Sequence, residues 1–154
     1  MKSLELKVPP PIVAILIGAA MWGLSYVPPV ADVPTYIRIA AGLVTATPGA
    51  IFALAGSTRI RRANTTINPM RPENASLLVT TGIFALTRNP MYVGLLFVVV
   101  GWAVFLSALW ALLLGPAGFV LYLTRFQIRP EERALSRLFG AQYSAYRSRV
   151  RRWL

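Results

Sequence analysis

Gly82-Ile-Phe-Ala-Leu-Thr-Arg-Asn-Pro-Met-Tyr-Val-Gly94 places a polar turn directly against a long uncharged run. The run continues without a charged residue from position 89 to position 124, whereas a helix crosses a bilayer with about 20 residues. It is therefore expected to fold as two helices joined by a tight turn near residues 105–109. A second polar cluster, Arg129-Pro130-Glu131-Glu132, follows the run. Because a helical hairpin returns the chain to the side from which it started, both polar clusters are expected to meet at one membrane surface.

The composition is typical of a membrane protein. Of the 154 residues, 56% are hydrophobic and 14% are charged, whereas a soluble domain has about 45–50% apolar and about 25% charged residues. A formal net charge of +11 first suggests nucleic acid as a partner. The charged blocks, however, alternate with uncharged runs long enough to cross a bilayer. Anionic lipid headgroups are therefore the expected counter-charge, and no nucleic-acid partner is expected.

Two further uncharged runs, residues 8–31 and 39–58, each have the length of one membrane span. The expected fold class is all-α: a polytopic membrane protein with four transmembrane helices and a C-terminal amphipathic helix at the interface. The sequence is interpreted as a single membrane domain, 1–154, with spans at about residues 10–27, 36–57, 90–106 and 109–127.

Arginine-rich blocks at residues 59–88 and beyond residue 124 determine the expected orientation. Positively charged loops stay in the cytoplasm, and both blocks share a side with Lys2 and Lys7 only if the number of spans is even. We therefore expect an integral membrane protein with both termini in the cytoplasm. Residues 2–20 also fit a secretory signal peptide, and that alternative stays open at this point.

The second predicted span has a stripe of small residues on one helical face: Gly42, Ala46, Gly49, Ala53 and Gly56. Such a face lets another helix backbone approach closely. The expected partner is a helix of the same chain, and the alternative is a homo-oligomer interface.

The residues that are missing restrict the possible chemistry. The chain has no Cys and no His, which excludes a thiol nucleophile and removes the commonest general base and transition-metal ligand. No metal site is expected. Acid–base chemistry has to use tyrosines, the substrate itself or the five acidic residues, which are Glu5, Asp32, Glu73, Glu131 and Glu132.

Both polar clusters have features of helix starts. Asn89 is a favoured N-cap residue, and Pro90 suits the first helical position. Pro130 is likewise expected to start a helix, with the two glutamates in its first turn. Because adjacent residues of a helix diverge by about 100°, Glu131 and Glu132 are expected to face different partners.

The segment from residue 131 to about 149 has an amphipathic pattern. This pattern is typical of a helix that lies on anionic lipid. Gly140 is expected to break or bend the helix.

The two clusters and the apolar hairpin between them resemble the family of integral-membrane methyltransferases that includes isoprenylcysteine carboxyl methyltransferase and phospholipid N-methyltransferases. The first motif of the resemblance comprises Gly82, Phe84, Arg88, Asn89, Pro90, Tyr92 and Gly94. The second comprises Glu131, Glu132, Leu135, Phe139, Gly140, Tyr143 and Tyr146. The resemblance covers about residues 65–152, which it makes the catalytic part, and the first two predicted spans carry no specific resemblance.

The resemblance implies a cofactor, S-adenosylmethionine, bound between the last membrane helices and the C-terminal helix. It also implies a lipophilic or lipid-linked methyl acceptor that reaches the site from the bilayer at the cytoplasmic face. Arg88 and Glu132 are the expected catalytic residues, with Arg88 available to orient the acceptor. The expected cofactor-binding residues are Gly82, Asn89, Pro90, Tyr92, Glu131, Glu132, Tyr143 and Tyr146.

One position departs from the family pattern. Asn89 stands where the carboxyl methyltransferases tend to have His, so the chain has no imidazole there. A carboxylate acceptor needs no base, whereas an amine must first lose a proton. This departure favours an anionic or weakly acidic acceptor without identifying it.

Two other functions are compatible with the sequence. One is a membrane-embedded oxidoreductase similar to the sterol reductases, which uses a nicotinamide cofactor. The other is a non-catalytic membrane scaffold or lipid-binding protein, because each motif residue also has a structural explanation. The identity of the acceptor and the oligomeric state stay open.

Overall fold

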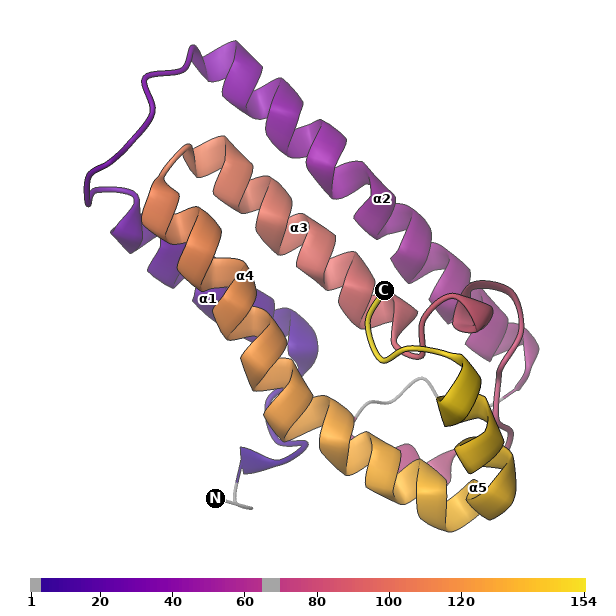
Figure 1. The fold of residues 1–154 in the computed structure, drawn as a ribbon. Helices are drawn as coiled ribbons and strands as arrows, with labels where there is room; N and C mark the ends of the chain where they lie inside the picture. The colour runs from indigo at the N-terminus through magenta and orange to yellow at the C-terminus, as the bar shows by residue number, and fades with distance from the viewer. Residues whose placement is uncertain (1–3, 65–69) are drawn as a thin grey trace.

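The computed structural model describes residues 4–64 and 70–154. Lys2 and the first five residues of the predicted catalytic part, 65–69, lie outside the described residues. The described part is all-helical, as predicted, and its α-helices are α1 (Pro10–Leu24), α2 (Thr35–Arg62), α3 (Pro90–Leu106), α4 (Leu109–Leu123) and α5 (Arg129–Arg149) (Figure 1). Three short elements accompany them: η2 (Pro72–Asn74), η3 (Gly82–Ala85) and the π-helix η4 (Thr124–Ile128).

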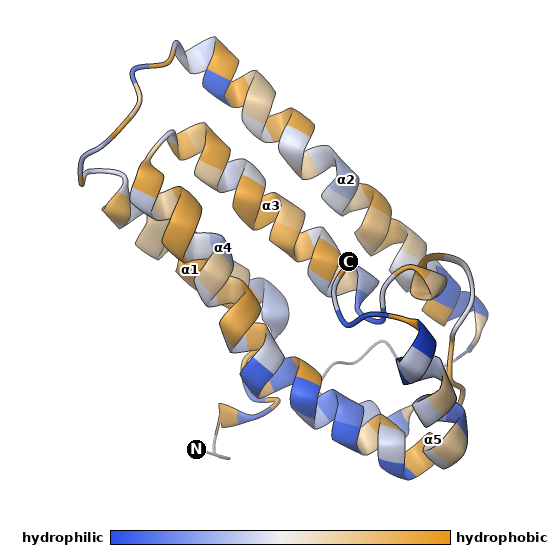
Figure 2. Ribbon diagram, in the orientation of Figure 1, coloured by the Kyte–Doolittle hydropathy of each residue, from blue (hydrophilic) through white to orange (hydrophobic). Residues whose placement is uncertain are grey.

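Among the described residues, two helical segments are long and apolar enough to cross a membrane: α2, with 28 residues, and the continuous run Leu109–Arg149, with 41 residues. Helices α1 and α3 are apolar but have only 15 and 17 residues, fewer than the roughly 20 that span a bilayer. Helix α1 ends at Leu24, before the predicted position 27. Hydrophobic residues predominate in α1, α3 and α4, and hydrophilic residues gather in α5 and at the end of α2 (Figure 2).

Helices α2 and α3 lie side by side along their lengths, and the small-residue stripe of α2 faces α3 (Figure 1). A Cβ atom on Gly49 would lie 2.5 Å from the Gly94 carbonyl oxygen, and one on Gly42 would lie 2.9 Å from the Gly101 carbonyl oxygen. Only glycine allows this approach of the two backbones. The stripe therefore packs within the chain, as expected, and is not open to a second copy.

The ends of the helices away from the polar clusters are closed by hydrogen bonds. The break between α3 and α4 falls at Ser107 and Ala108, within the predicted turn region. Arg38 donates to the Phe105 and Leu106 carbonyl oxygens at 2.6 and 3.2 Å. It therefore satisfies carbonyl groups that the end of a helix leaves unpaired.

The chain turns out of α4 differently from the prediction. No new helix starts at Pro130, because the helical chain continues from α4 through η4 into α5. A π-helical turn accommodates such a change of register without ending the helix. Gly140 has φ 46° and ψ −120°, so it breaks α5 as expected. The second half of α5 then leads the chain back toward the start of α3 (Figure 1).

Candidate functional site

A cavity of about 140 Å³ lies where the start of α3 meets α5 and the loop between α2 and α3. The predicted site residues that line it are Arg88, Asn89, Pro90, Tyr92, Glu131, Glu132, Tyr143 and Tyr146. The rest of its wall is largely apolar and includes Ile60, Leu78, Phe84 and Leu135. The structure therefore brings the two polar clusters together.

Gly82 is the predicted site residue that does not line this cavity. Its φ is +65°, and a Cβ atom there would lie 2.7 Å from Arg59 Nε. The glycine is thus required for a left-handed turn against Arg59. The prediction that Gly82 contacts the cofactor has no support in this geometry.

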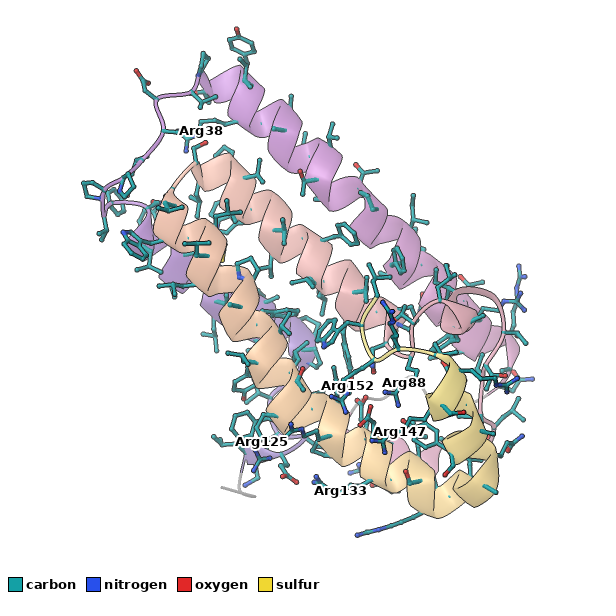
Figure 3. All side chains as sticks on the ribbon, viewed as in Figure 1. Arg38, Arg88, Arg125, Arg133, Arg147 and Arg152 are labelled. Carbon is teal, nitrogen blue, oxygen red and sulfur yellow. The ribbon has the colours of Figure 1, made fainter. Side chains whose placement is uncertain are left out.

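Glu132 is buried and paired with two arginines, Arg88 and Arg152, which lie close together in Figure 3. Arg152 binds both of its carboxylate oxygens, at 2.9 and 2.7 Å, and Arg88 Nη1 lies 3.1 Å from Oε1. Burial alone would raise the pKa of the Glu132 carboxyl, but the hydrogen bond from Arg152 and the charges of Arg88 and Arg152 hold that pKa below its usual value. Glu132 is therefore ionised at neutral pH.

Glu131 has a different environment. Its Oε1 accepts hydrogen bonds from the Tyr92 hydroxyl and from Gln127 Nε2, the latter at 2.8 Å. Desolvation is the largest influence on the carboxyl and outweighs these hydrogen bonds, which raises its pKa to about 7. The two adjacent carboxyls therefore face different partners, as predicted, and differ in charge near neutral pH.

Arg88 lines the cavity, and one of its donors is buried without a partner among the described residues. Its side chain is 8% exposed, and its Nη1 donates to the Tyr143 hydroxyl at 3.4 Å in addition to pairing with Glu132. Its Nε is buried and has no hydrogen-bond partner among the described residues. A buried unpaired donor costs about 1–3 kcal/mol.

The segment after α5 completes the site, although no sequence motif indicated it. The Arg88 backbone N–H donates to the Arg151 carbonyl at 3.0 Å, and the Thr87 hydroxyl donates to the Arg152 carbonyl at 3.2 Å. Trp153 Nε1 donates to the Thr124 hydroxyl at 3.2 Å. These contacts attach residues 151–153 to the starts of α3 and η4.

Asn89 precedes the first residue of α3, as predicted, but its side chain does not cap the helix. Its amide instead donates to the Arg152 carbonyl at 2.8 Å. The prediction of a side-chain cap is therefore wrong, because the returning segment offers a nearby acceptor. Asn89 joins the two motifs through this segment.

The two tyrosines of the second motif act differently. The Tyr146 hydroxyl donates to the Phe84 carbonyl at 2.7 Å, which anchors the second half of α5 on η3. The Tyr143 hydroxyl faces Arg88. Burial raises the pKa of both phenols, so both stay neutral and able to donate at physiological pH.

Two polar residues of the site were absent from the predicted set. Gln127 is a polar side chain one turn before Glu131, and this i, i+4 spacing was available as a signal. Arg152 belongs to a basic block that the positive-inside rule already explains, so no local pattern linked it to Glu132. The described residues contain no group of three potential metal ligands.

Comparison with known proteins places this geometry in a family. The model of the phospholipid methyltransferase family matches residues 37–142, which include both polar clusters. An uncharacterized protein of Haemophilus influenzae is 41% identical over 66 residues, which are 42% of this chain and 100% of the relative. No solved structure gives a significant match. The family match covers more than half of the chain, and the protein therefore belongs to the phospholipid methyltransferase family.

Proposed function

We propose that this protein is an integral-membrane methyltransferase that uses S-adenosylmethionine to methylate a lipophilic or amphiphilic acceptor at the cytoplasmic membrane face. One observation carries the proposal: Arg88 from the start of α3 and Glu132 from α5 form a buried ion pair in the wall of one cavity, and Arg88 Nε is left without a partner. Family membership supports methyl transfer in general.

In the proposed membrane arrangement, α1 to α4 all lie in the bilayer and both termini are cytoplasmic. Helices α1 and α3 are too short to span alone, but both pack against α4. Helix α4 belongs to the run Leu109–Arg149, which is long enough to span. The arginines of the two basic blocks, residues 59–88 and 125–152, flank the cavity end of the bundle, whereas Arg38 lies at the other end, and an excess of positive charge is typical of a cytoplasmic face. The catalytic part is residues 65–152.

The chemistry of the cavity wall fits the methyl donor. Glu131 is a carboxyl that a neighbouring cation would ionise, and Tyr143 and the apolar wall suit an adenine ring. When bound, the donor supplies a sulfonium-activated methyl group for a direct displacement. Small-molecule sites usually have about 300–1,000 Å³, so the 140 Å³ enclosed by the described wall holds only part of such a ligand.

The two glutamates have different roles in this proposal, because among the described residues Glu132 forms ion pairs and Glu131 does not. Glu132 is already held by Arg88 and Arg152, so in this proposal it positions the Arg88 guanidinium. Glu131, with a pKa of about 7, is able to accept a proton near neutral pH. Glu131 is therefore the candidate proton acceptor if the methyl acceptor is an amine, because the chain lacks His.

Ligand-dependent stability tests the proposal. A ligand that binds only the folded state raises its stability, so the melting temperature of the purified protein is expected to rise with S-adenosylmethionine or its demethylated product. A rise with reduced nicotinamide dinucleotide alone would indicate an oxidoreductase, and no rise with any of them would indicate a scaffold. Radiolabelled methyl donor with a membrane lipid extract then identifies the labelled product.

A further inference from the structure

Outside the cavity, η4 and α5 carry an arginine ladder, which we define as Arg125, Arg129, Arg133 and Arg137. Residues four positions apart lie on the same side of a helix. All four line a groove of about 1,030 Å³ whose other wall includes Leu6 and two acidic residues, Glu5 and Glu73, against the four arginines. The Leu6 backbone N–H donates to the Phe126 carbonyl at 3.0 Å, which attaches the N-terminal segment to the ladder.

The positive charge of the ladder is only partly compensated. Glu5 pairs with Arg125 at 3.0 Å and also with Arg133 (Figure 3). Arg129 and Arg137 are exposed and form no ion pair with any described residue. The groove thus has unpaired guanidinium groups on both sides of Arg133.

A second cleft brings two more arginines close to the ladder. It measures about 520 Å³ and contains Arg129, Arg133 and Arg137 together with Arg147 and Arg152. The acidic residue in its wall is Glu132, which Arg88 and Arg152 already occupy. Like charges at i, i+4 positions repel one another, so an anion in this region would stabilise the folded helix.

The position of the ladder and the chemistry of arginine define the anion. The ladder begins at Arg125, where the uncharged run of residues 89–124 ends, and basic clusters at the end of a membrane helix attract anionic headgroups. Guanidinium groups bind phosphate with paired hydrogen bonds. Arg129 and Arg137 are roughly 12 Å apart along the helix axis, so each would share a phosphate with Arg133 and not with the other.

We propose that the arginine ladder is a binding site for the headgroup of an anionic phospholipid, separate from the methyl-transfer cavity. Arg129 or Arg137 holds the phosphate together with Arg133, and Glu5 limits the charge of the site through its ion pairs with Arg125 and Arg133. This site does not depend on the methyl-transfer reaction, and its test therefore measures binding alone.

The test uses the full chain in phosphatidylcholine micelles, with short-chain phosphatidylglycerol as the titrant. The melting temperature is expected to rise to saturation with phosphatidylglycerol, but not with equal amounts of short-chain phosphatidylcholine or inorganic phosphate. An equal response to inorganic phosphate would show a simple anion site and overturn the lipid assignment. A response that is absent or does not saturate would overturn the site.

Variants locate the binding. Arg129→Gln/Arg137→Gln is expected to weaken the apparent affinity roughly tenfold, and it should fold because neither side chain has an ion-pair partner in the described structure. Arg61→Gln/Arg62→Gln removes the same charge from the exposed end of α2 and is expected to change the affinity less than about twofold. Equal losses in both variants would show non-specific attraction and overturn the proposal.

A third variant is expected to raise the affinity for phosphatidylglycerol instead of lowering it. Glu5→Gln frees Arg125 and Arg133, so it is expected to strengthen phosphatidylglycerol binding by about threefold. A weaker affinity in this variant would contradict the role assigned to Glu5 and to the ladder.

Discussion

At the scale of single residues, neighbouring carboxyls in the site have opposite electrostatic environments. Two guanidinium groups stabilise the charge of Glu132, whereas desolvation opposes the charge of Glu131. Helix geometry separates them by about 100°, which the sequence already predicted. Which carboxyl would be paired was not predictable, because Arg152 reaches Glu132 through a segment with no recognisable motif.

The raised pKa of Glu131 predicts a pH-dependent stability. Its pKa is about 7 in the folded protein against an ordinary value of 4.5, so the folded state binds more protons between these values. Stability therefore falls as pH rises from about 5 to about 8. Denaturant unfolding of Glu131→Gln across this pH range should show a smaller decline than the wild type, and an unchanged decline would contradict the assignment.

Loss of the Glu132 carboxylate should destabilise the protein. Glu132→Ala leaves Arg88 buried without its counter-ion and should lower the free energy of unfolding by about 3 kcal/mol. Glu73→Gln is the matched control, because Glu73 forms no ion pair with described residues and should change stability by less than about 0.5 kcal/mol. Similar unfolding midpoints for both variants would show that the buried pair contributes little.

Arg88 provides a test of chemistry and not only of stability. Arg88→Ala should slow methyl transfer by at least about 100-fold, with a smaller loss of cofactor affinity if Nε serves the acceptor. Rates and Kd values for S-adenosylmethionine, measured separately, distinguish the two roles. Loss of cofactor binding would instead make Arg88 a cofactor ligand, and an unchanged rate would remove it from the reaction.

At the scale of helices, the contact between α2 and α3 depends on glycine. Gly49→Ala would place a Cβ atom 2.5 Å from the Gly94 carbonyl oxygen, and the resulting strain should cost about 1–3 kcal/mol. Gly118→Ala is the control, because a Cβ atom there would meet nothing within 4 Å. It should leave the melting temperature unchanged or raise it, since alanine favours a helix more than glycine does. Equal melting temperatures for the two variants would contradict the close packing.

The predictability of the helices follows from the forces that form them. The uncharged runs and the basic blocks predicted the four apolar helices and the turn at Ser107. Both signals are local, because the length of an apolar run and the position of charged residues are visible in the sequence itself. The continuous passage through η4 was missed, since proline at position 130 usually marks a helix start. Gln127 and Ile128 of η4 are buried, and this burial depends on tertiary packing that the local sequence does not indicate.

At the scale of the whole molecule, the site depends on a segment that follows the second motif and belongs to neither motif. The hairpin argument predicted that the two clusters converge, and the structure brings them together. The contribution of residues 151–153 was not predictable, because it uses backbone carbonyl groups, which every residue has whatever its side chain. Sequence patterns therefore do not predict the hydrogen bonds by which residues 151–153 close the cavity.

Removal of residues 151–154 tests this dependence. The deletion eliminates the acceptors of the Arg88 N–H and the Asn89 amide together with the Arg152–Glu132 pair. Stabilisation by S-adenosylmethionine should be lost while the helical circular dichroism signal is retained. Deletion of Leu154 alone, which is 58% exposed, should preserve both. Undiminished ligand stabilisation in the longer deletion would show that the segment is dispensable.

The backbone contact of α2 with α3 also has a mechanical consequence. Because a Cβ atom on Gly49 would lie only 2.5 Å from the Gly94 carbonyl oxygen, the two backbones have no room to move closer, and we expect the two helices to move as one rigid unit. The enclosed space beside it is too small for a whole nucleoside-bearing ligand, and the extra room has to come from elsewhere. We expect the opposite wall to swing, pivoting where Gly140 interrupts α5 with open space around it.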